Sequence, residues 1–371
     1  MNRAPEPFGS ARQPGSHGRP VRYLIGILVA AILAALACGA LVFALVPAPV
    51  AAEYWVREML IVKRHLAHLH SKRPKILVVA GSNVLFGVDA GLLSRELGVP
   101  VINFGLHGAL PLEVLLEEAG RAAVPGDAVV LPLEYPYFSG LVSYGPWQVR
   151  NDVAWNPDHW RQVPLSRRVA ALATMGPGFV REVVQARWQA WRHAADLTPR
   201  LHALDDAAIL DSLTRAPEPT ALAYSAYALD AWGTLRNTEG RVFDGPAVPA
   251  NLPVCLAPAS RAQLAEFVQR SAARRIAVYF ANTPWVDSGA VADGSLERAD
   301  AALCSALADL APVLDRRVDL VFPRELFLDT YLHLRTAGRE RRTRVLLAGL
   351  RAQWPILGID RLATGGGDPQ P

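Results

Sequence analysis

A run from Tyr23 to Val46 contains no charged residue, and it divides the chain into two parts. In a helix that rises about 1.5 Å per residue, the run is long enough to cross the hydrocarbon core of a bilayer. The basic residues before it are Arg3, Arg12, Arg19 and Arg22, with Glu6 as the one acid. The positive-inside rule therefore predicts a cytoplasmic N-terminus and a main domain that is periplasmic or extracellular, on a single-pass anchor.

A cleavable signal peptide is the main alternative, with Val50-Ala51-Ala52 as a weak cleavage site. The apolar run is longer than the 7–15 residues usual for a signal peptide, which favours a retained anchor. Cys38 follows Leu36-Ala37 and faintly suggests a lipoprotein site. The run stays apolar beyond it, so a thiol buried in the membrane is the preferred interpretation.

The composition of the chain argues against nucleic-acid binding and against a metal site. The net charge is only +4 and the basic residues are scattered, which argues against a nucleic-acid partner. No CxxC motif and no His/Cys cluster at metal-ligand spacing is present in the sequence, so we expect neither a metal nor a cofactor. Residues 1–22 and 363–371 have the composition of disordered tails, and 47–74 that of an amphipathic linker helix.

Strands and helices alternate in the rest of the chain, which predicts an α/β domain with a mainly parallel sheet over residues 75–362. Residues 137–250 interrupt the alternation as a Trp-rich insertion with two helical stretches near 166–194. The expected strands are 75–80, 100–104, 128–133, 276–281 and 318–322. The expected helices are 89–97, 111–124, 260–274, 296–310 and 337–353.

Ser82 follows the first expected strand in Gly81-Ser82-Asn83, at the sheet edge where sites of open α/β folds collect. A serine hydroxyl becomes a nucleophile when a base takes its proton and a third group orients that base. Asp329 and His333 follow the last expected strand and could supply these groups. The alternatives are an ordinary turn at Ser82 and a surface pair or helix cap at 329 and 333.

Backbone N–H groups near Ser82 could stabilise an oxyanion. Those of Ser82 and Asn83 lie at a helix entrance, and a glycine-containing segment, Asn103 to Gly108, leaves the second strand at the same edge. His107 in that segment is interpreted as a core histidine.

Three blocks of residues resemble the motifs of SGNH/GDSL-type hydrolases. They are Val78-Val79-Ala80-Gly81-Ser82-Asn83, Val101-Ile102-Asn103-Phe104-Gly105-Leu106-His107-Gly108, and Asp329 with His333. The chain looks most like the membrane-anchored branch that includes periplasmic proteins of alginate O-acetylation and the D-alanyl transfer protein of teichoic-acid modification. The resemblance covers about 75–135 and 275–350, and implies an SGNH-like three-layer fold.

The resemblance makes Ser82 the nucleophile and an oxyanion donor, Gly108 a second donor, and Asp329 with His333 the remaining catalytic pair. Three residues separate Asp329 from His333, where the family has two. The third block, Gly-x-Asn-Asp, has no counterpart, and Glu134 lies at that position. An ionised Glu134 cannot donate as the family's Asn does, so Asn83 and Asn282 are the candidate replacements for that Asn.

These features predict a serine acyl esterase or O-acyltransferase that acts on a cell-envelope or exported polysaccharide. The resemblance also implies an acyl donor and a multi-spanning membrane acyltransferase as partners. The alternative is a catalytically inactive SGNH-like scaffold or glycan-binding protein of an envelope polysaccharide system. Cys255 and Cys304, both in the exported part, are candidates for a disulfide, with two unpaired thiols as the alternative.

Overall fold

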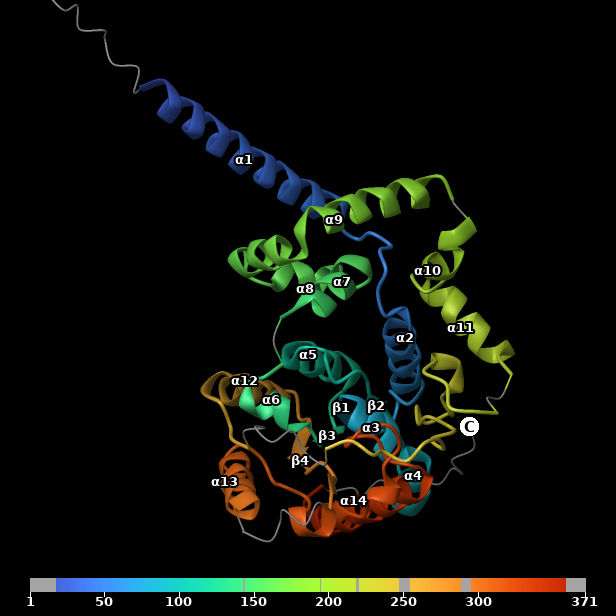
Figure 1. The fold of residues 1–371 in the computed structure, drawn as a ribbon. Helices are drawn as coiled ribbons and strands as arrows, with labels where there is room; N and C mark the ends of the chain where they lie inside the picture. Colours follow the sequence, from blue (N-terminus) through green and yellow to red (C-terminus); the bar gives the residue numbers. More distant parts are fainter. Residues whose placement is uncertain are drawn as a thin grey trace, which may run out of the picture.

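The computed structural model describes residues 18–142, 144–193, 195–217, 220–246, 254–287 and 295–357. The expected tail at 363–371 and most of that at 1–22 lie outside these ranges. The fold is α/β, with one long N-terminal helix that projects from the rest of the molecule (Figure 1).

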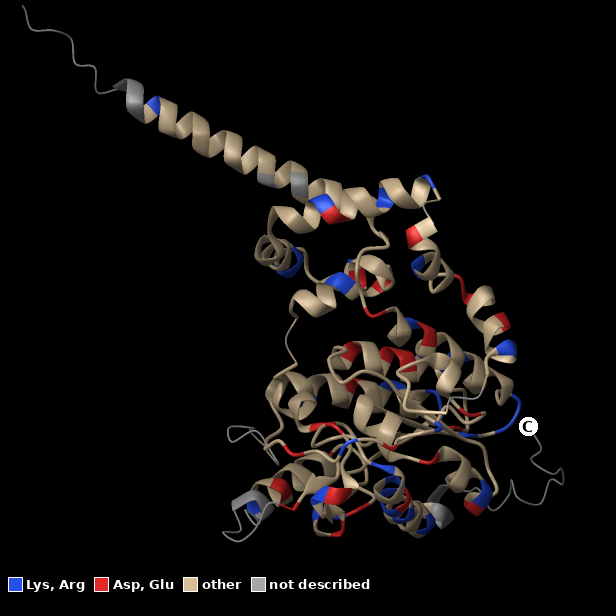
Figure 2. Cartoon of the chain, turned by 45° about the vertical axis from the view of Figure 1, so that its right-hand side comes forward, with Lys and Arg blue, Asp and Glu red and all other residues tan. Residues whose placement is uncertain are grey.

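Helix α1 (Gly18–Leu45) contains the apolar run, and its segment Val21–Leu45 is a candidate membrane span. Figure 2 shows charge only near the start of this helix. The side chain of Cys38 is outside the described set. Helix α2 (Tyr54–Leu69) is the expected amphipathic helix, and it buries one face against the α/β domain.

Four parallel strands form the central sheet, in the order β2-β1-β3-β4. They are β1 (Ile76–Ala80), β2 (Val101–Gly105), β3 (Ala128–Leu131) and β4 (Ala277–Phe280). Their side chains are almost all buried, as expected for β-branched strands covered on both faces. Four of the five strands expected from the sequence are therefore in the sheet.

Helices cover both faces of the sheet (Figure 1). On one face lie α5 (Leu112–Ala122) and α12 (Pro258–Ala273), and on the other α4 (Ala90–Leu97) and α14 (Thr336–Leu357). The short helices α3 (Ser82–Gly87) and α6 (Tyr135–Ser139) follow β1 and β3, and α13 (Ser295–Ala308) follows β4. Asp89 caps α4 by accepting a bond from the N–H of Leu92 at 2.8 Å.

The fifth expected strand, 318–322, is wrong in its extent and its partner. Residues Arg317–Leu320 form a 3₁₀ turn (η4), and only β6 (Val321–Phe322) is extended. β6 pairs in parallel with β5 (Trp285–Val286) in a separate two-stranded sheet. Arg317 and Leu320 are buried one turn apart, so their apolar contacts are made from a helical turn rather than from a strand.

The insertion at 137–250 is mostly helical up to Arg215 and mostly loop over 220–246, and its helices lie between the α/β domain and α1 (Figure 1). Its long helix α9 (Leu165–Trp191) packs against α1 and kinks at Gly176, whose φ is 71°, before Pro177. The other helices are α7 (Pro146–Ala154), α8 (Pro157–Gln162), α10 (Thr198–His202) and α11 (Asp206–Arg215). The short 3₁₀ turns of its described part are η1 (Ala195–Leu197) and η2 (Ala226–Ala228), while η5 (Arg324–Leu326) follows β6 in the α/β domain.

Candidate active site

Ser82 is the first residue of α3, directly after β1 and Gly81. The sequence predicted a turn here and missed this helix. Gly81 has no room for a side chain, because a Cβ there would lie 2.6 Å from the Cα of Gly108. The turn that carries Ser82 therefore lies against the segment that leaves β2. A Cβ built on Gly108 would be 3.6 Å from Ser82 Oγ, which places the two residues side by side.

Two buried side chains, those of Asn103 and Lys63, stabilise the position of α3 next to the end of β2. The Asn103 amide donates to the carbonyls of Val84 and Val88, both at 2.8 Å, and so fastens α3 to β2. Lys63 Nζ, fully buried, donates to the carbonyls of Asn103 at 2.9 Å and Gly105 at 2.6 Å. These bonds fix the end of β2 and thereby the approach of Gly108 to Ser82.

Glu134, at the end of β3, lies directly beneath the Ser82 turn and is buried. Its carboxylate accepts the N–H groups of Gly81 and Asn83, each at 3.1 Å. Burial raises the pKa of Glu134 to about 7, although these two N–H donors favour the ionised form. The carboxyl group of Glu134 therefore titrates near neutral pH.

This titration predicts a pH-dependent stability. The folded-state pKa of Glu134 is above the ordinary value of 4.5, so folding favours its protonated form. That contribution is complete below about pH 4.5 and is lost as the pH rises through about 7. We expect the melting temperature of the wild type, relative to Glu134→Gln, to fall between about pH 5 and 8. A constant difference across this range, measured by circular dichroism, would contradict the prediction.

Asp329 and His333 meet in a turn stabilised by Thr330, whose Oγ1 accepts the N–H of His333 at 3.2 Å. Despite the extra residue between them, Asp329 Oδ1 lies 2.7 Å from His333 Nδ1. Tyr224 donates its hydroxyl to Asp329 Oδ2 at 2.7 Å. Burial opposes ionisation, but the hydrogen bonds from His333 and Tyr224 keep the pKa of Asp329 below its ordinary value. The pair thus has an ionised orienting carboxylate.

His333 lies on the side of α3 that carries Ser82. Its ring stacks on Phe86 at a centroid distance of 4.0 Å and an interplanar angle of 9°. Phe86 is one helical turn beyond Ser82 and shares its face of the helix. Within the described part of the chain, neither Ser82 Oγ nor His333 Nε2 makes a hydrogen bond. The structure therefore holds no direct Ser82–His333 hydrogen bond, and the stacking of His333 on Phe86 is the contact that relates the two residues.

The candidate oxyanion donors differ in whether their N–H groups already donate a hydrogen bond within the protein. Asn83 gives its backbone N–H to Glu134, and its side-chain amide donates to the carbonyl of Pro132 at 2.7 Å. Asn282 donates its amide to Asp315. The N–H groups of Ser82 and Gly108 donate to no acceptor among the described residues. The geometry thus leaves these two backbone groups as donors, and neither asparagine replaces the missing third-block side chain.

Aromatic side chains that sequence reasoning did not assign to the site surround it. His107, interpreted above as a core residue, stacks on Trp147 of α7 at 4.6 Å and meets Trp55 of α2 edge-on at 5.6 Å. Trp55 also contacts Tyr224, which in turn contacts Phe86. These residues are distant in sequence and share no local motif. The Trp content of the insertion could have indicated Trp147 but not Trp55 or Tyr224.

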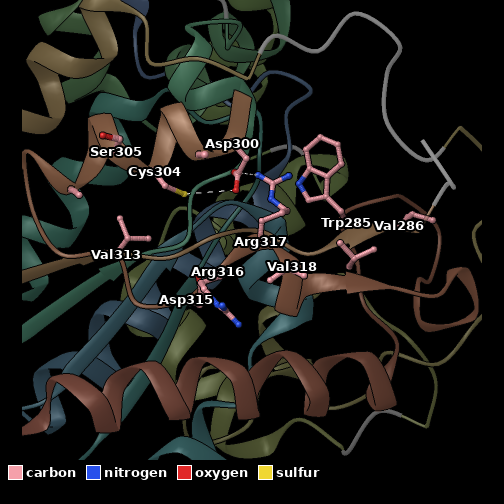
Figure 3. Close-up of a pocket in the computed structure, with 13 residues that line it drawn as sticks. Trp285, Val286, Asp300, Cys304, Ser305, Val313, Asp315, Arg316, Arg317 and Val318 are labelled. Atoms are coloured by element: carbon pink, nitrogen blue, oxygen red, sulfur yellow. Dashed lines mark hydrogen bonds and ion pairs between the residues drawn. The ribbon is translucent and has the colours of Figure 1, made fainter. Parts of the chain in front are cut away.

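A cavity of about 630 Å³ lies between α13, β5 and η4, and neither Ser82 nor His333 is among the residues that line it (Figure 3). Arg317 lines it, with its guanidinium carbon 4.5 Å from the ring of Tyr135 and 4.4 Å from that of Trp285. It forms an ion pair with Asp300, and burial lowers the pKa of Arg317 to about 9. Two of its nitrogens, Nε and Nη1, are buried without a partner in the described structure.

Cys255 and Cys304 do not form the disulfide for which they were candidates. Cys255 and Cys304 are free thiols, Cys255 exposed and Cys304 half-buried beside the cavity (Figure 3). Cys304 Sγ lies 3.6 Å from Asn282 Oδ1 and 3.8 Å from Asp300 Oδ2. Burial and the neighbouring Asp300 raise the pKa of Cys304 to about 11.

Thiol modification should distinguish these two cysteines. Alkylation requires the thiolate, which a pKa of about 11 makes scarce at pH 8. We expect Cys255 to react with iodoacetamide at least about 100-fold faster than Cys304. Peptide mass spectrometry over a time course measures both rates, with Cys255→Ser as the control. Equal rates would contradict the described environment of Cys304.

Comparisons with protein-family models, with curated proteins and with solved structures found no match to this chain.

Proposed function

We propose that the protein is a membrane-anchored, outward-facing serine acyl esterase or O-acyltransferase of the SGNH type, acting on a cell-envelope or exported polysaccharide. One observation carries the proposal. His333, joined to Asp329 through Nδ1, stacks on Phe86, which lies one helical turn after Ser82 in α3. This supports the base and orienting roles of an acyl-transfer triad; the described structure holds no Ser82–His333 hydrogen bond, and the proposal requires one to form when substrate binds.

In this mechanism Ser82 Oγ attacks the carbonyl carbon of an acyl ester while its proton passes to His333 Nε2. Asp329 holds the ring through Nδ1 and stabilises the imidazolium. The N–H groups of Ser82 and Gly108 donate to the oxyanion. The intermediate collapses as the leaving alkoxide takes the proton from His333. A sugar hydroxyl or water then attacks the acyl-serine and gives its proton to His333, which returns it to Ser82 Oγ as the acyl–serine bond breaks.

In this mechanism the protonation state of Glu134 determines whether the site opposes the negative charge of the oxyanion. When ionised, it places a carboxylate next to the N–H groups of the nucleophile turn and opposes an oxyanion. When protonated, it removes that repulsion and could itself donate a hydrogen bond. With a pKa of about 7, the protonated form is available at neutral pH. The proposed activity is thus compatible with Glu at the position where the family has Asn.

The same residue favours the second candidate function, a catalytically inactive scaffold or glycan-binding protein. An ionised Glu134 satisfies two backbone donors of the turn and can serve structure alone. The aromatic residues around His107 would then form a sugar-binding surface. Polysaccharide binding that survives Ser82→Ala, with no reactive serine, would favour this function.

Labelling with a fluorophosphonate serine probe tests the proposal. The full chain in detergent is compared with Ser82→Ala and His333→Ala, and turnover of an aryl acetate is measured in parallel. We expect labelling of the wild type alone. Absence of labelling in a wild type shown by circular dichroism to be folded would refute an intrinsically activated serine.

A further inference from the structure

The second half of α9, from Pro177 to Trp191, carries apolar side chains on two opposite faces. One face is buried against the protein, through Phe179, Val183 and Ala186. The other face is exposed at helical spacings of four and three residues, with Val184 at 38%, Trp188 at 56% and Trp191 at 72%. No neighbour in the described structure covers this second face.

Basic residues lie along the exposed face. Arg181, Arg187 and Arg192 are exposed, and the Arg192 guanidinium is 5.7 Å from the ring of Trp188. The one acid of this half, Glu182, is paired with Arg150 at 2.9 Å. Tryptophan with arginine on an otherwise apolar helix face is typical of helices that lie in a membrane interface.

The chain that leaves α1 is bonded directly to this half of α9. Arg187 donates to the carbonyl of Pro47 at 3.0 Å, and Glu182 accepts the N–H of Ala51 at 3.0 Å. The end of α1 also packs against α9, and Figure 2 shows the basic residues of α9 beside that end. The helix is therefore held at the level where the apolar segment ends.

We propose that residues 177–191 lie in the headgroup interface of the bilayer that α1 crosses, with Trp188 and Trp191 toward the acyl chains and the arginines beside anionic headgroups. The inference rests on the proposed membrane insertion of α1 and not on the chemistry of Ser82. The proposal also orients the candidate active site relative to the membrane. Helix α7 packs on α9, and Trp147 of α7 stacks on His107, in the segment that lies beside Ser82. These contacts connect Ser82 to the side of the molecule that carries α9.

Single fluorophores on the full-length chain test this position. Cys38→Ala, Cys255→Ala and Cys304→Ala remove the native thiols, and one cysteine is introduced by Leu33→Cys, Val184→Cys or Val318→Cys. Each variant is labelled with an environment-sensitive dye and reconstituted in phosphatidylcholine vesicles containing phosphatidylglycerol. Nitroxide lipids spin-labelled near the headgroup or deep in the acyl chain act as quenchers. Val318 is the matched control, an exposed valine on η4, remote from α9.

The proposal expects loss of fluorescence at 184 with the shallow nitroxide, at 33 with the deep one, and at 318 with neither. Quenching at 33 with position 184 behaving like 318 would overturn it and leave the anchor intact. No quenching at 33 would overturn the membrane insertion and this inference together. A signal at 184 that depends on protein concentration and not on nitroxide lipid would assign the face to a second copy of the chain instead.

Discussion

Ser82→Ala should lower kcat/KM for an aryl acetate by at least about 10⁴-fold, and His333→Ala should do the same. In the proposed mechanism Ser82 supplies the nucleophile and His333 removes its proton, so neither group would work without the other. For this reason the double variant should be no slower than either single variant. Rates measured for all three proteins against a buffer blank give the comparison.

Ser139→Ala is the matched control for these variants. Its hydroxyl bonds only to backbone carbonyls of its own helix, Tyr135 at 3.2 Å and Pro136 at 3.5 Å. Turnover by Ser139→Ala should stay within about twofold of the wild type, since surface-type hydroxyls of this kind affect neither charge nor packing strongly. Effects of Ser82→Ala and His333→Ala that multiply in the double variant would show that the two residues act independently. That result would contradict the triad.

Asp127→Ala should destabilise the fold by about 3–5 kcal/mol, because it leaves a buried charge without its partner. Lys75 Nζ and Asp127 Oδ2 are 2.6 Å apart, and both side chains are fully buried. Asp127 also accepts the N–H groups of Lys75 at 3.0 Å and Val124 at 2.7 Å. These two residues precede β1 and β3, so their pairing also aligns the starts of the two strands. Chemical denaturation of the detergent-solubilised chain measures the change.

The exposed pair Arg161–Asp158 provides the control, with side chains 63% and 69% exposed. Asp158→Ala should change the free energy of unfolding by no more than about 1 kcal/mol. A double replacement, Lys75→Met with Asp127→Leu, removes both charges and should recover most of the loss. If Asp127→Ala were as mild as Asp158→Ala, the buried ion pair would not be the contact that aligns β1 with β3.

The sheet strands were predictable because each is a short, buried, β-branched run bounded by turn residues. The run ending at Ala80 also placed Ser82 at the carboxyl edge correctly. The segment 318–322 was assigned wrongly because four of its five residues are apolar, which does not distinguish a strand from a buried turn. A buried 3₁₀ turn and a short strand give the same composition over five residues.

Local patterns in the amino-acid sequence determined the apolar N-terminal helix, the parallel α/β core and the position of Ser82. These features can be predicted because the spacing of apolar residues and the residue preferences of turns depend on only a few neighbouring residues. Only the tertiary structure decided that His333 stacks on Phe86, that Tyr224 bonds Asp329, and that α9 lies against the end of α1. These contacts join segments separated by 100 residues or more, whose path runs through irregular loops with no period. Their geometry depends on packing of the whole chain, so no local pattern carries it.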